Sequence, residues 1–134
     1  MYNYTASIKI TQDTVRGLLC TAFEGGSNYW YTNVEPLDFP DGKSLVDYAQ
    51  GGSMQSQDNY WHWSQLIPTT GGSVKVETVD NDVFHLDDKT IQSGLSLMST
   101  KYEKHFSDVL TENYDATTGD VFLQLCLFKE IVYG

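Results

Sequence analysis

The C-terminal segment of the chain constrains the fold most, because apolar residues occur on nearly every side of it. Asp120 opens the segment, apolar residues dominate up to Phe128, and Ile131, Val132 and Tyr133 continue the pattern. A helix that is hydrophobic all round must be covered on most of its sides. The segment therefore predicts a central helix, or a buried strand at its end, with the other elements packed around it.

Alternating apolar and polar residues predict three strands. The alternation over residues 2–10 is typical of a half-buried strand. A second alternation covers residues 74–79, and a third covers 83–86 after a turn near residues 80–82. The last two strands, so closely spaced, predict a β-hairpin.

Helical spacing predicts two more helices. Thr11 is a candidate N-cap for a helix over residues 12–24. Apolar residues three to four positions apart predict a long helix that begins after Asp87 or Asp88 and extends to Val109.

The connecting segments carry turn-forming residues. Residues 32–42 contain Pro36 and Pro40 and predict a loop. A short helix is expected over residues 45–50, and the polar stretch 53–59 is expected to be the most mobile part of the chain.

Residues 60–67 fit either a strand or a helix that ends at Pro68, and residues 113–119 predict a loop before the last helix. These patterns together predict an α+β fold. We expect a small antiparallel sheet with about three main helices, the C-terminal helix central, in a single domain over residues 1–134.

The stretch from Gly25 to Tyr31 places two glycines beside three consecutive aromatic residues, and a second aromatic cluster follows near residue 62. Aromatic faces stack on nucleic-acid bases with roughly 1–3 kcal/mol each, and the free N–H groups of Gly-Gly-Ser turns can bind an anion. The same segments can instead cap a small core, end regular elements or form an oligomer interface, where Tyr and Trp are enriched. The candidate ligand-binding residues are Gly25, Gly26, Ser27, Asn28, Tyr29, Trp30, Tyr31, Trp61, His62 and Trp63.

The charge of the chain excludes several partners. It carries 8 basic and 18 acidic residues, a formal net charge of -10, and Arg16 is the only arginine. Direct binding to nucleic acid or to anionic membranes needs a basic surface, so neither is expected. An acidic chain can dock on a basic protein, although acidity can also serve solubility alone. No apolar run is long enough to span a bilayer, and we expect a soluble, intracellular protein.

Motifs for metal, cofactor or covalent chemistry are absent from the sequence. His62, His85 and His105 do not have metal-ligand spacing, and no EF-hand, P-loop, GxGxxG or GxSxG pattern occurs. We therefore expect no cofactor and no metal. Cys20 and Cys126 are expected to be free buried thiols, although a disulfide is possible if their helices pack side by side.

Two segments resemble a family of small bacteriophage and prophage proteins for which no activity is established. The first is Thr21–Tyr31, which matches the family's EGGSxYW segment, and the second is Asp120–Gly134, which is similar to its LFGEIVYG ending. Lys129 departs from the family, which usually has glycine there. The resemblance implies a phage origin and a location in the host cytoplasm, and it carries over no catalytic residue.

These observations leave three hypotheses for function. The first is a non-enzymatic phage accessory protein that counters a host defence by binding and sequestering a small nucleotide signal. The second is an acidic inhibitor of a basic host effector protein, such as a CRISPR nuclease. The third is a small hydrolase that uses His62 or His85 with an aspartate. An enclosed pocket between the aromatic segments favours the first, clustered exposed carboxylates the second, and a His–Asp pair in a cleft the third.

Overall fold

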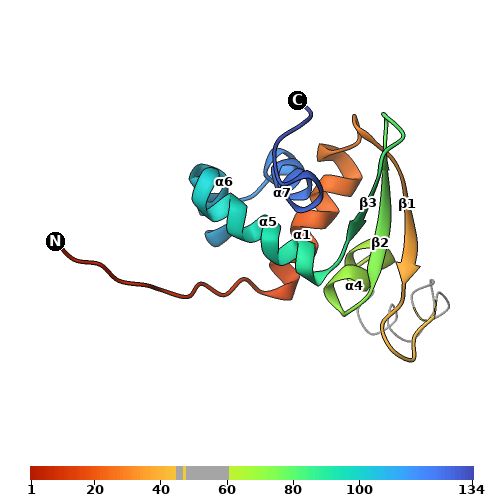
Figure 1. Ribbon diagram of the computed structural model, residues 1–134, viewed down its shortest axis with the longest axis horizontal. Helices are drawn as coiled ribbons and strands as arrows, with labels where there is room; N and C mark the ends of the chain where they lie inside the picture. Colours follow the sequence, from red (N-terminus) through yellow and green to blue (C-terminus); the bar gives the residue numbers. More distant parts are fainter. Residues whose placement is uncertain (45–46, 48–60) are drawn as a thin grey trace.

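The computed structural model describes residues 1–44, 47 and 61–134, and over these residues a three-stranded antiparallel sheet packs beside a group of helices (Figure 1). The expected α+β class is confirmed. The described elements, in chain order, are α1 (Gln12–Thr21), the π-helix η1 (Ala22–Gly26), β1 (Tyr31–Asp38), α4 (Trp63–Thr69), β2 (Ser73–Thr78), β3 (Val83–Leu86), α5 (Asp88–Lys101), α6 (Glu103–Leu110) and α7 (Ala116–Phe128).

The β2–β3 hairpin forms as its alternation predicts. The two strands pair antiparallel, with Val76 opposite Phe84. Asn81 takes the left-handed conformation at the turn, with φ 65°. The hydroxyl of Thr78 accepts the N–H of Asp82 at 3.3 Å, which closes the turn.

The expected loop over residues 32–42 is wrong, because most of it belongs to strand β1. β1 pairs antiparallel with β2, and Val34 lies opposite Val76. The sheet order β1-β2-β3 makes β1 an edge strand. An edge strand needs ladder hydrogen bonds on one side only, so it tolerates Pro36, which has no N–H to donate.

Helix α7 begins earlier than its apolar pattern indicates, at Ala116 instead of Asp120. The carboxylate of Asp115 caps it by accepting the N–H of Thr118 at 3.0 Å. The helix ends before Lys129, which adopts a left-handed conformation with φ 63°. This conformation favours glycine over residues that carry a side chain.

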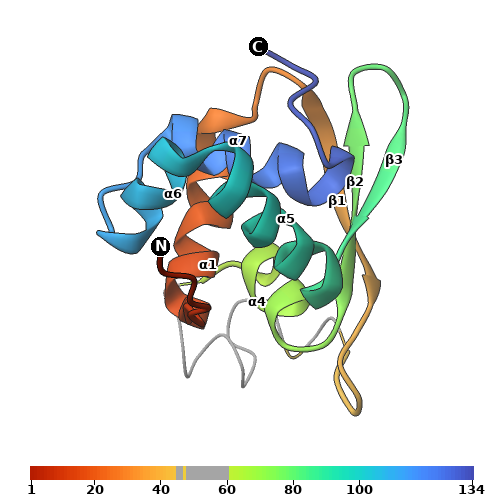
Figure 2. The same ribbon diagram turned by 60° about the vertical axis from the view of Figure 1, so that its left-hand side comes forward.

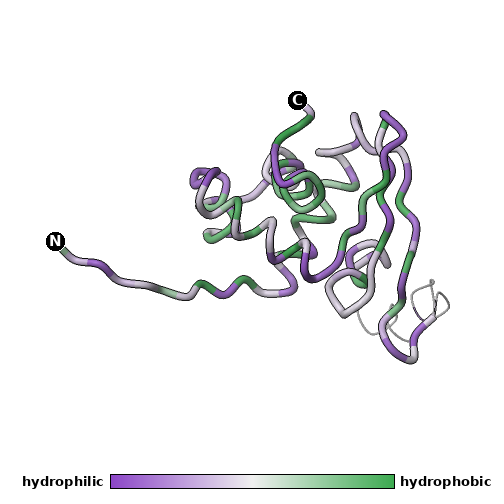
Figure 3. Tube along the Cα trace, in the orientation of Figure 1, coloured by the Kyte–Doolittle hydropathy of each residue, from purple (hydrophilic) through white to green (hydrophobic). Residues whose placement is uncertain are grey.

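The central position of α7 is confirmed. It contacts α1, η1, α5, α6 and β3. Figure 2 shows its place within the helical group, and the hydropathy colours of Figure 3 mark much of the segment as hydrophobic. Glycines on the neighbouring interfaces permit close approach. A Cβ at Gly119 would lie 2.8 Å from the carbonyl oxygen of Leu18, and one at Gly94 would lie 2.5 Å from Sγ of Cys126. None of the helices in the described ranges combines the length and apolar character needed to cross a membrane.

The first helix forms where expected, but its last turn is wider than an α-helical turn. Thr11 caps it as predicted, with its hydroxyl oxygen 3.2 Å from the N–H donor of Thr14. From Ala22 the chain continues as the π-helix η1, in which the N–H of Ser27 donates to the carbonyl of Ala22 at 2.8 Å. This wider turn sets the direction in which the aromatic-glycine stretch leaves the helix.

The single long helix expected up to Val109 is wrong, because the chain breaks into α5 and α6. Tyr102 separates them with φ -135° and ψ 55°, outside the helical range. The expected cap is confirmed at Asp87, whose carboxylate accepts the N–H of Thr90 at 2.9 Å. The break changes the direction of the chain between α5 and α6. The apolar stripe that predicted one helix is therefore divided between two.

The ambiguous segment before Pro68 is helix α4, and it does not end at the proline. The helix continues to Thr69, whose hydroxyl donates to the carbonyl of Gln65 at 2.7 Å. Such bonds supply donors in a turn where proline has none. The helix expected over residues 45–50 and the mobile stretch expected over 53–59 fall outside the described residues, apart from Asp47.

The expected N-terminal strand is wrong. Residues 1–10 extend away from the body in Figure 1, and among the described residues no strand pairs with them. The side chains of Tyr2 and Tyr4 are 96% and 89% exposed. We call residues 1–10 the N-terminal arm.

Both cysteines are free, as expected. Cys126 is buried against α5, and burial raises the pKa of its thiol. Cys20 is only half-buried, so the expectation of buried thiols holds for Cys126 and not for Cys20.

Candidate functional site

The aromatic-glycine stretch is anchored on a buried carboxylate, Asp120 of α7. One oxygen of this carboxylate, Oδ1, accepts the hydroxyl of Ser27 at 2.8 Å and the indole N–H of Trp30 at 2.7 Å. The other, Oδ2, accepts the hydroxyl of Tyr29 at 2.6 Å. Ser27 and Trp30 are fully buried. A buried charge is stable only where it is paired or well hydrogen-bonded, and these donors meet that need.

Gln124, one turn further along α7, joins the same network to the end of the chain. Its amide nitrogen lies 3.2 Å from Oδ1 of Asp120, and its amide oxygen accepts the backbone N–H groups of Val132 and Tyr133, both at 2.9 Å. The ring of Tyr133 stacks on Trp30, with centroids 5.4 Å apart and planes 1° from parallel. The two segments on which the family resemblance rests are therefore in direct contact. We call this network the Asp120 cluster.

The two glycines of the stretch have different roles. A Cβ at Gly26 would lie 2.1 Å from the backbone oxygen of Ala116, so only glycine permits this approach between η1 and the start of α7. A Cβ at Gly25 would meet nothing within 4 Å. Close packing explains Gly26, whereas nothing in the structure explains Gly25.

The candidate binding residues therefore separate into three groups. Ser27 and Trp30 lie in the core and cannot face a ligand, although the aromatic pattern had suggested a surface role for Trp30. Asn28 and Tyr29 are exposed at a turn, and Trp61 is half-buried against the core. Tyr31, His62 and Trp63 line a groove, whereas Gly25 and Gly26 do not.

This groove lies where η1, β1 and the start of α4 meet, and its volume is about 300 Å³. It brings Tyr31 of the first aromatic segment beside His62 and Trp63 of the second. We call it the η1–β1–α4 groove. Its lining is completed by residues that sequence reasoning missed, namely Phe23, Glu24, Thr32, Asn33, Val34, Ser64 and Gln65.

The aromatic side chains of the groove are held by neighbours. Tyr31 donates its hydroxyl to the carbonyl of Phe23, and the two rings meet edge to face with centroids 5.4 Å apart. The ring of His62 lies 4.7 Å from that of Trp63. His62 also caps α4, because its Nδ1 accepts the backbone N–H of Ser64 at 3.2 Å. In the neutral ring the proton is therefore on Nε2.

Glu24 gives the groove a negative potential. Burial, followed by the charge of Glu24, raises the pKa of the Tyr31 hydroxyl and of the Cys20 thiol. Burial lowers the pKa of His62, while the same carboxylate acts in the opposite direction. Thus one carboxylate influences three titratable groups around it. None of the described lining residues is lysine or arginine, so no side chain of the lining offsets this charge.

The His–Asp pair that the hydrolase hypothesis requires does not occur among the described residues. The hydroxyl of Ser64 lies 2.9 Å from Nδ1 of His62, but Ser64 is only 4% exposed, and this contact belongs to the helix cap. No histidine in the described ranges forms a hydrogen bond or ion pair with a carboxylate. No group of three or more His, Cys, Asp or Glu residues there could hold a metal ion. The hydrolase hypothesis has no support in this geometry.

One signal in the sequence pointed to the Asp120 cluster. Asp120 and Gln124 are polar residues four positions apart within an otherwise apolar helix, and buried polar groups require partners. The partners of Asp120, Ser27 and Trp30, lie about 90 residues away and have no local signal.

Comparison with known proteins gives no match, either to a family model, to a curated protein or to a solved structure.

Proposed function

We propose that this chain is a non-enzymatic accessory protein of a phage or prophage, and that it acts by docking on a basic host protein. The phage origin rests on the resemblance of the two segments that meet at the Asp120 cluster. The mode of action rests on the η1–β1–α4 groove, where Tyr31 and Trp63 stand beside Glu24 without a basic residue in the lining. A basic effector of host defence, such as a CRISPR nuclease, is the kind of target that we propose.

The chemistry of the groove suits the guanidinium group of an arginine. A guanidinium is planar and cationic, so it stacks on aromatic rings and pairs with a carboxylate at the same time. Glu24 supplies the carboxylate, while Trp63 and Tyr31 supply ring surfaces. The net charge of -10 adds a long-range attraction that speeds encounter with a basic partner.

A nucleotide is the second candidate ligand, and one observation favours it. Two aromatic side chains from different elements meet in a single groove, as stacking on a base requires. The phosphates of a nucleotide argue against it, because the lining holds a carboxylate and no lysine or arginine. The Gly25-Gly26-Ser27 segment does not supply an anion site either, because Ser27 is buried on Asp120.

An NMR titration with two probes tests the proposal. The labelled protein is titrated with an arginine-rich peptide and, separately, with adenosine monophosphate, and shifts at residues of the groove are followed. Trp63→Ala removes the principal ring surface and should weaken peptide binding by roughly five- to thirtyfold, the equivalent of about 1–2 kcal/mol of cation–π attraction.

Glu24→Gln, with Glu103→Gln as its matched control, separates the two ligands. Both variants remove one negative charge, but only Glu24 lines the groove, whereas Glu103 is exposed on α6. Peptide affinity should fall for Glu24→Gln more than for Glu103→Gln. Nucleotide binding that improves in Glu24→Gln, with no peptide binding at the groove, would replace the proposal by the nucleotide hypothesis. Equal losses of peptide affinity in both variants would mean that Glu24 contributes only to the overall charge and not to a contact in the groove.

A further inference from the structure

The N-terminal arm has the residue pattern of a strand and no strand beside it. Its even-numbered positions are apolar, and its odd-numbered positions 3, 5, 7 and 9 are polar. Tyr2, Tyr4 and Ile8 are 96%, 89% and 58% exposed. Isolated apolar side chains on a surface are ordinary, but a whole alternating face exposed along one segment marks an interaction site.

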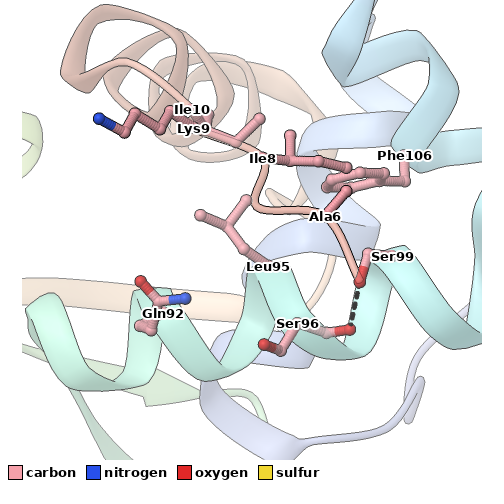
Figure 4. Close-up of a pocket in the computed structure, with 9 residues that line it drawn as sticks. All are labelled: Ala6, Ile8, Lys9, Ile10, Gln92, Leu95, Ser96, Ser99 and Phe106. Atoms are coloured by element: carbon pink, nitrogen blue, oxygen red, sulfur yellow. Dashed lines mark hydrogen bonds between the residues drawn. The ribbon is translucent and has the colours of Figure 1, made fainter. Parts of the chain in front are cut away.

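The arm already forms one wall of a cavity of about 560 Å³ against α5 and α6. Figure 4 shows Ala6 and Ile8 beside Phe106, with Leu95, Ser96 and Ser99 of α5 on the other side of the cavity. The wall is loosely packed, since Ile8 stays more than half exposed. The cavity therefore has an apolar side that this chain does not fill.

The arm also differs from the rest of the chain in charge. The first twelve residues of the chain, which include the arm, contain Lys9 and no carboxylate side chain, so all 18 acidic residues lie in the remainder. The cavity has no carboxylate in its lining. Two copies of this acidic chain repel each other over most of their surfaces, and the repulsion is weakest at the arm and its cavity.

We infer that the arm pairs antiparallel with the arm of a second copy of this chain, centred on Ala6. In this register Tyr2 lies opposite Ile10 of the second copy, and Tyr4 opposite its Ile8. Ala6 lies opposite Ala6. All apolar residues then share one face, and two kinds of aromatic–aliphatic pair form, which is a favourable cross-strand combination.

Other registers satisfy the pattern less well. A shift by one residue places Tyr2 opposite Lys9 and mixes apolar with polar positions on each face. Centring on Thr5 keeps the faces apart but places Tyr4 opposite Ala6, a smaller partner than Ile8. Pairing about Ala6 also places Tyr4 of the second copy beside Ile8, at the mouth of the cavity. Two-stranded ribbons need a helix or further strands for support, and here α5 and α6 provide it.

Cysteine crosslinking tests the register directly. Directly opposite residues have Cα atoms within about 5.5 Å, a separation that a disulfide spans, whereas residues displaced by two positions exceed about 7 Å. Ala6→Cys should therefore give a disulfide-linked dimer under mild oxidation. Thr5→Cys is the matched control, because Thr5 is equally exposed on the same arm but lies opposite Ser7 of the second copy. Both variants carry Cys20→Ser to remove the half-buried native thiol.

The oligomeric state provides the second readout. Light scattering should give twice the mass of the chain at high concentration, and removal of residues 2–7 should halve it. A chain that stays monomeric at all concentrations overturns the inference, as does a dimer that survives the deletion. A dimer that requires the arm but crosslinks equally through Thr5→Cys overturns the proposed pairing. This inference does not depend on the proposed function.

Discussion

The aromatic-glycine stretch and the N-terminal arm each differ in burial from what their sequences suggest, and they differ in opposite directions. The stretch has the composition of a binding loop, yet Ser27 and Trp30 are fully buried on Asp120. The arm has the alternation of a half-buried strand, yet Tyr2 and Tyr4 are exposed. Both segments contain aromatic residues, so aromatic content does not distinguish them.

The difference lies in the partners that each segment finds. The stretch meets a buried carboxylate that needs hydrogen-bond donors, and a glycine there admits the start of α7. The arm meets no strand edge among the described residues, and an extended backbone without a neighbour gains no ladder hydrogen bonds. Burial thus follows the availability of polar partners as much as hydrophobicity.

Loss of the Asp120 carboxylate should have the largest effect on stability. Asp120→Ala leaves the buried donors of Ser27 and Trp30 without an acceptor, and we expect a loss of about 3–5 kcal/mol in the free energy of unfolding. Urea denaturation measures it. Asp115→Ala on the same helix is the control, because it removes only a cap, worth about 1 kcal/mol. Equal losses in the two variants would contradict the central role of the Asp120 cluster.

A second test compares the two adjacent glycines. Gly26→Ala forces a Cβ against the backbone oxygen of Ala116 and should lower the free energy of unfolding by about 1–3 kcal/mol. Gly25→Ala meets open space and should be neutral or slightly stabilising, since alanine is the better helix former. Thermal unfolding of both variants gives the comparison. A destabilised Gly25→Ala variant would contradict the open space that surrounds a Cβ at this position.

The raised pKa of the Tyr29 hydroxyl predicts that the stability of the fold depends on pH in the alkaline range. Burial, followed by its hydrogen bond to Asp120, raises the pKa of Tyr29 from 10.0 to about 12. A raised pKa means that the folded protein holds this proton more tightly. The stabilisation is therefore complete below the unfolded pKa and disappears as the pH rises toward 12.

Tyr29→Phe isolates this contribution. The variant should lose about 1 kcal/mol at neutral pH, a modest value because Tyr29 is 53% exposed. The difference in unfolding free energy between the two proteins should then shrink above pH 10. Tyr2→Phe, on the exposed arm, should match the unsubstituted protein throughout. A difference in unfolding free energy that stays constant across the alkaline range would contradict the stabilising role of the Tyr29 hydroxyl proton.

The arm should contribute least to the stability of a single chain. Deletion of residues 2–7 removes side chains that are exposed and backbone that pairs with no described strand. At concentrations low enough to exclude association, we expect a change below about 0.5 kcal/mol, as for ordinary surface substitutions. Urea denaturation at low protein concentration measures this. A larger loss would show that the arm packs on its own chain more firmly than its exposure indicates.

The sequence by itself determined the features that depend on neighbouring residues. The β2–β3 hairpin, the caps at Thr11 and Asp87, and the apolar central helix all follow from periodicity and cap chemistry within a few positions. The sequence also indicated both aromatic segments as candidate binding segments. Of their residues, Tyr31, His62 and Trp63 line one groove.

Only the tertiary structure decided which side chains of these segments are buried. Trp30 is core because Asp120 lies on a helix distant in sequence, and β1 is a strand because β2 offers it an edge. The arm is extended and unpaired because the sheet ends without it. In each case the deciding partner is remote along the chain, and local patterns carry no information about which remote groups will satisfy a hydrogen bond.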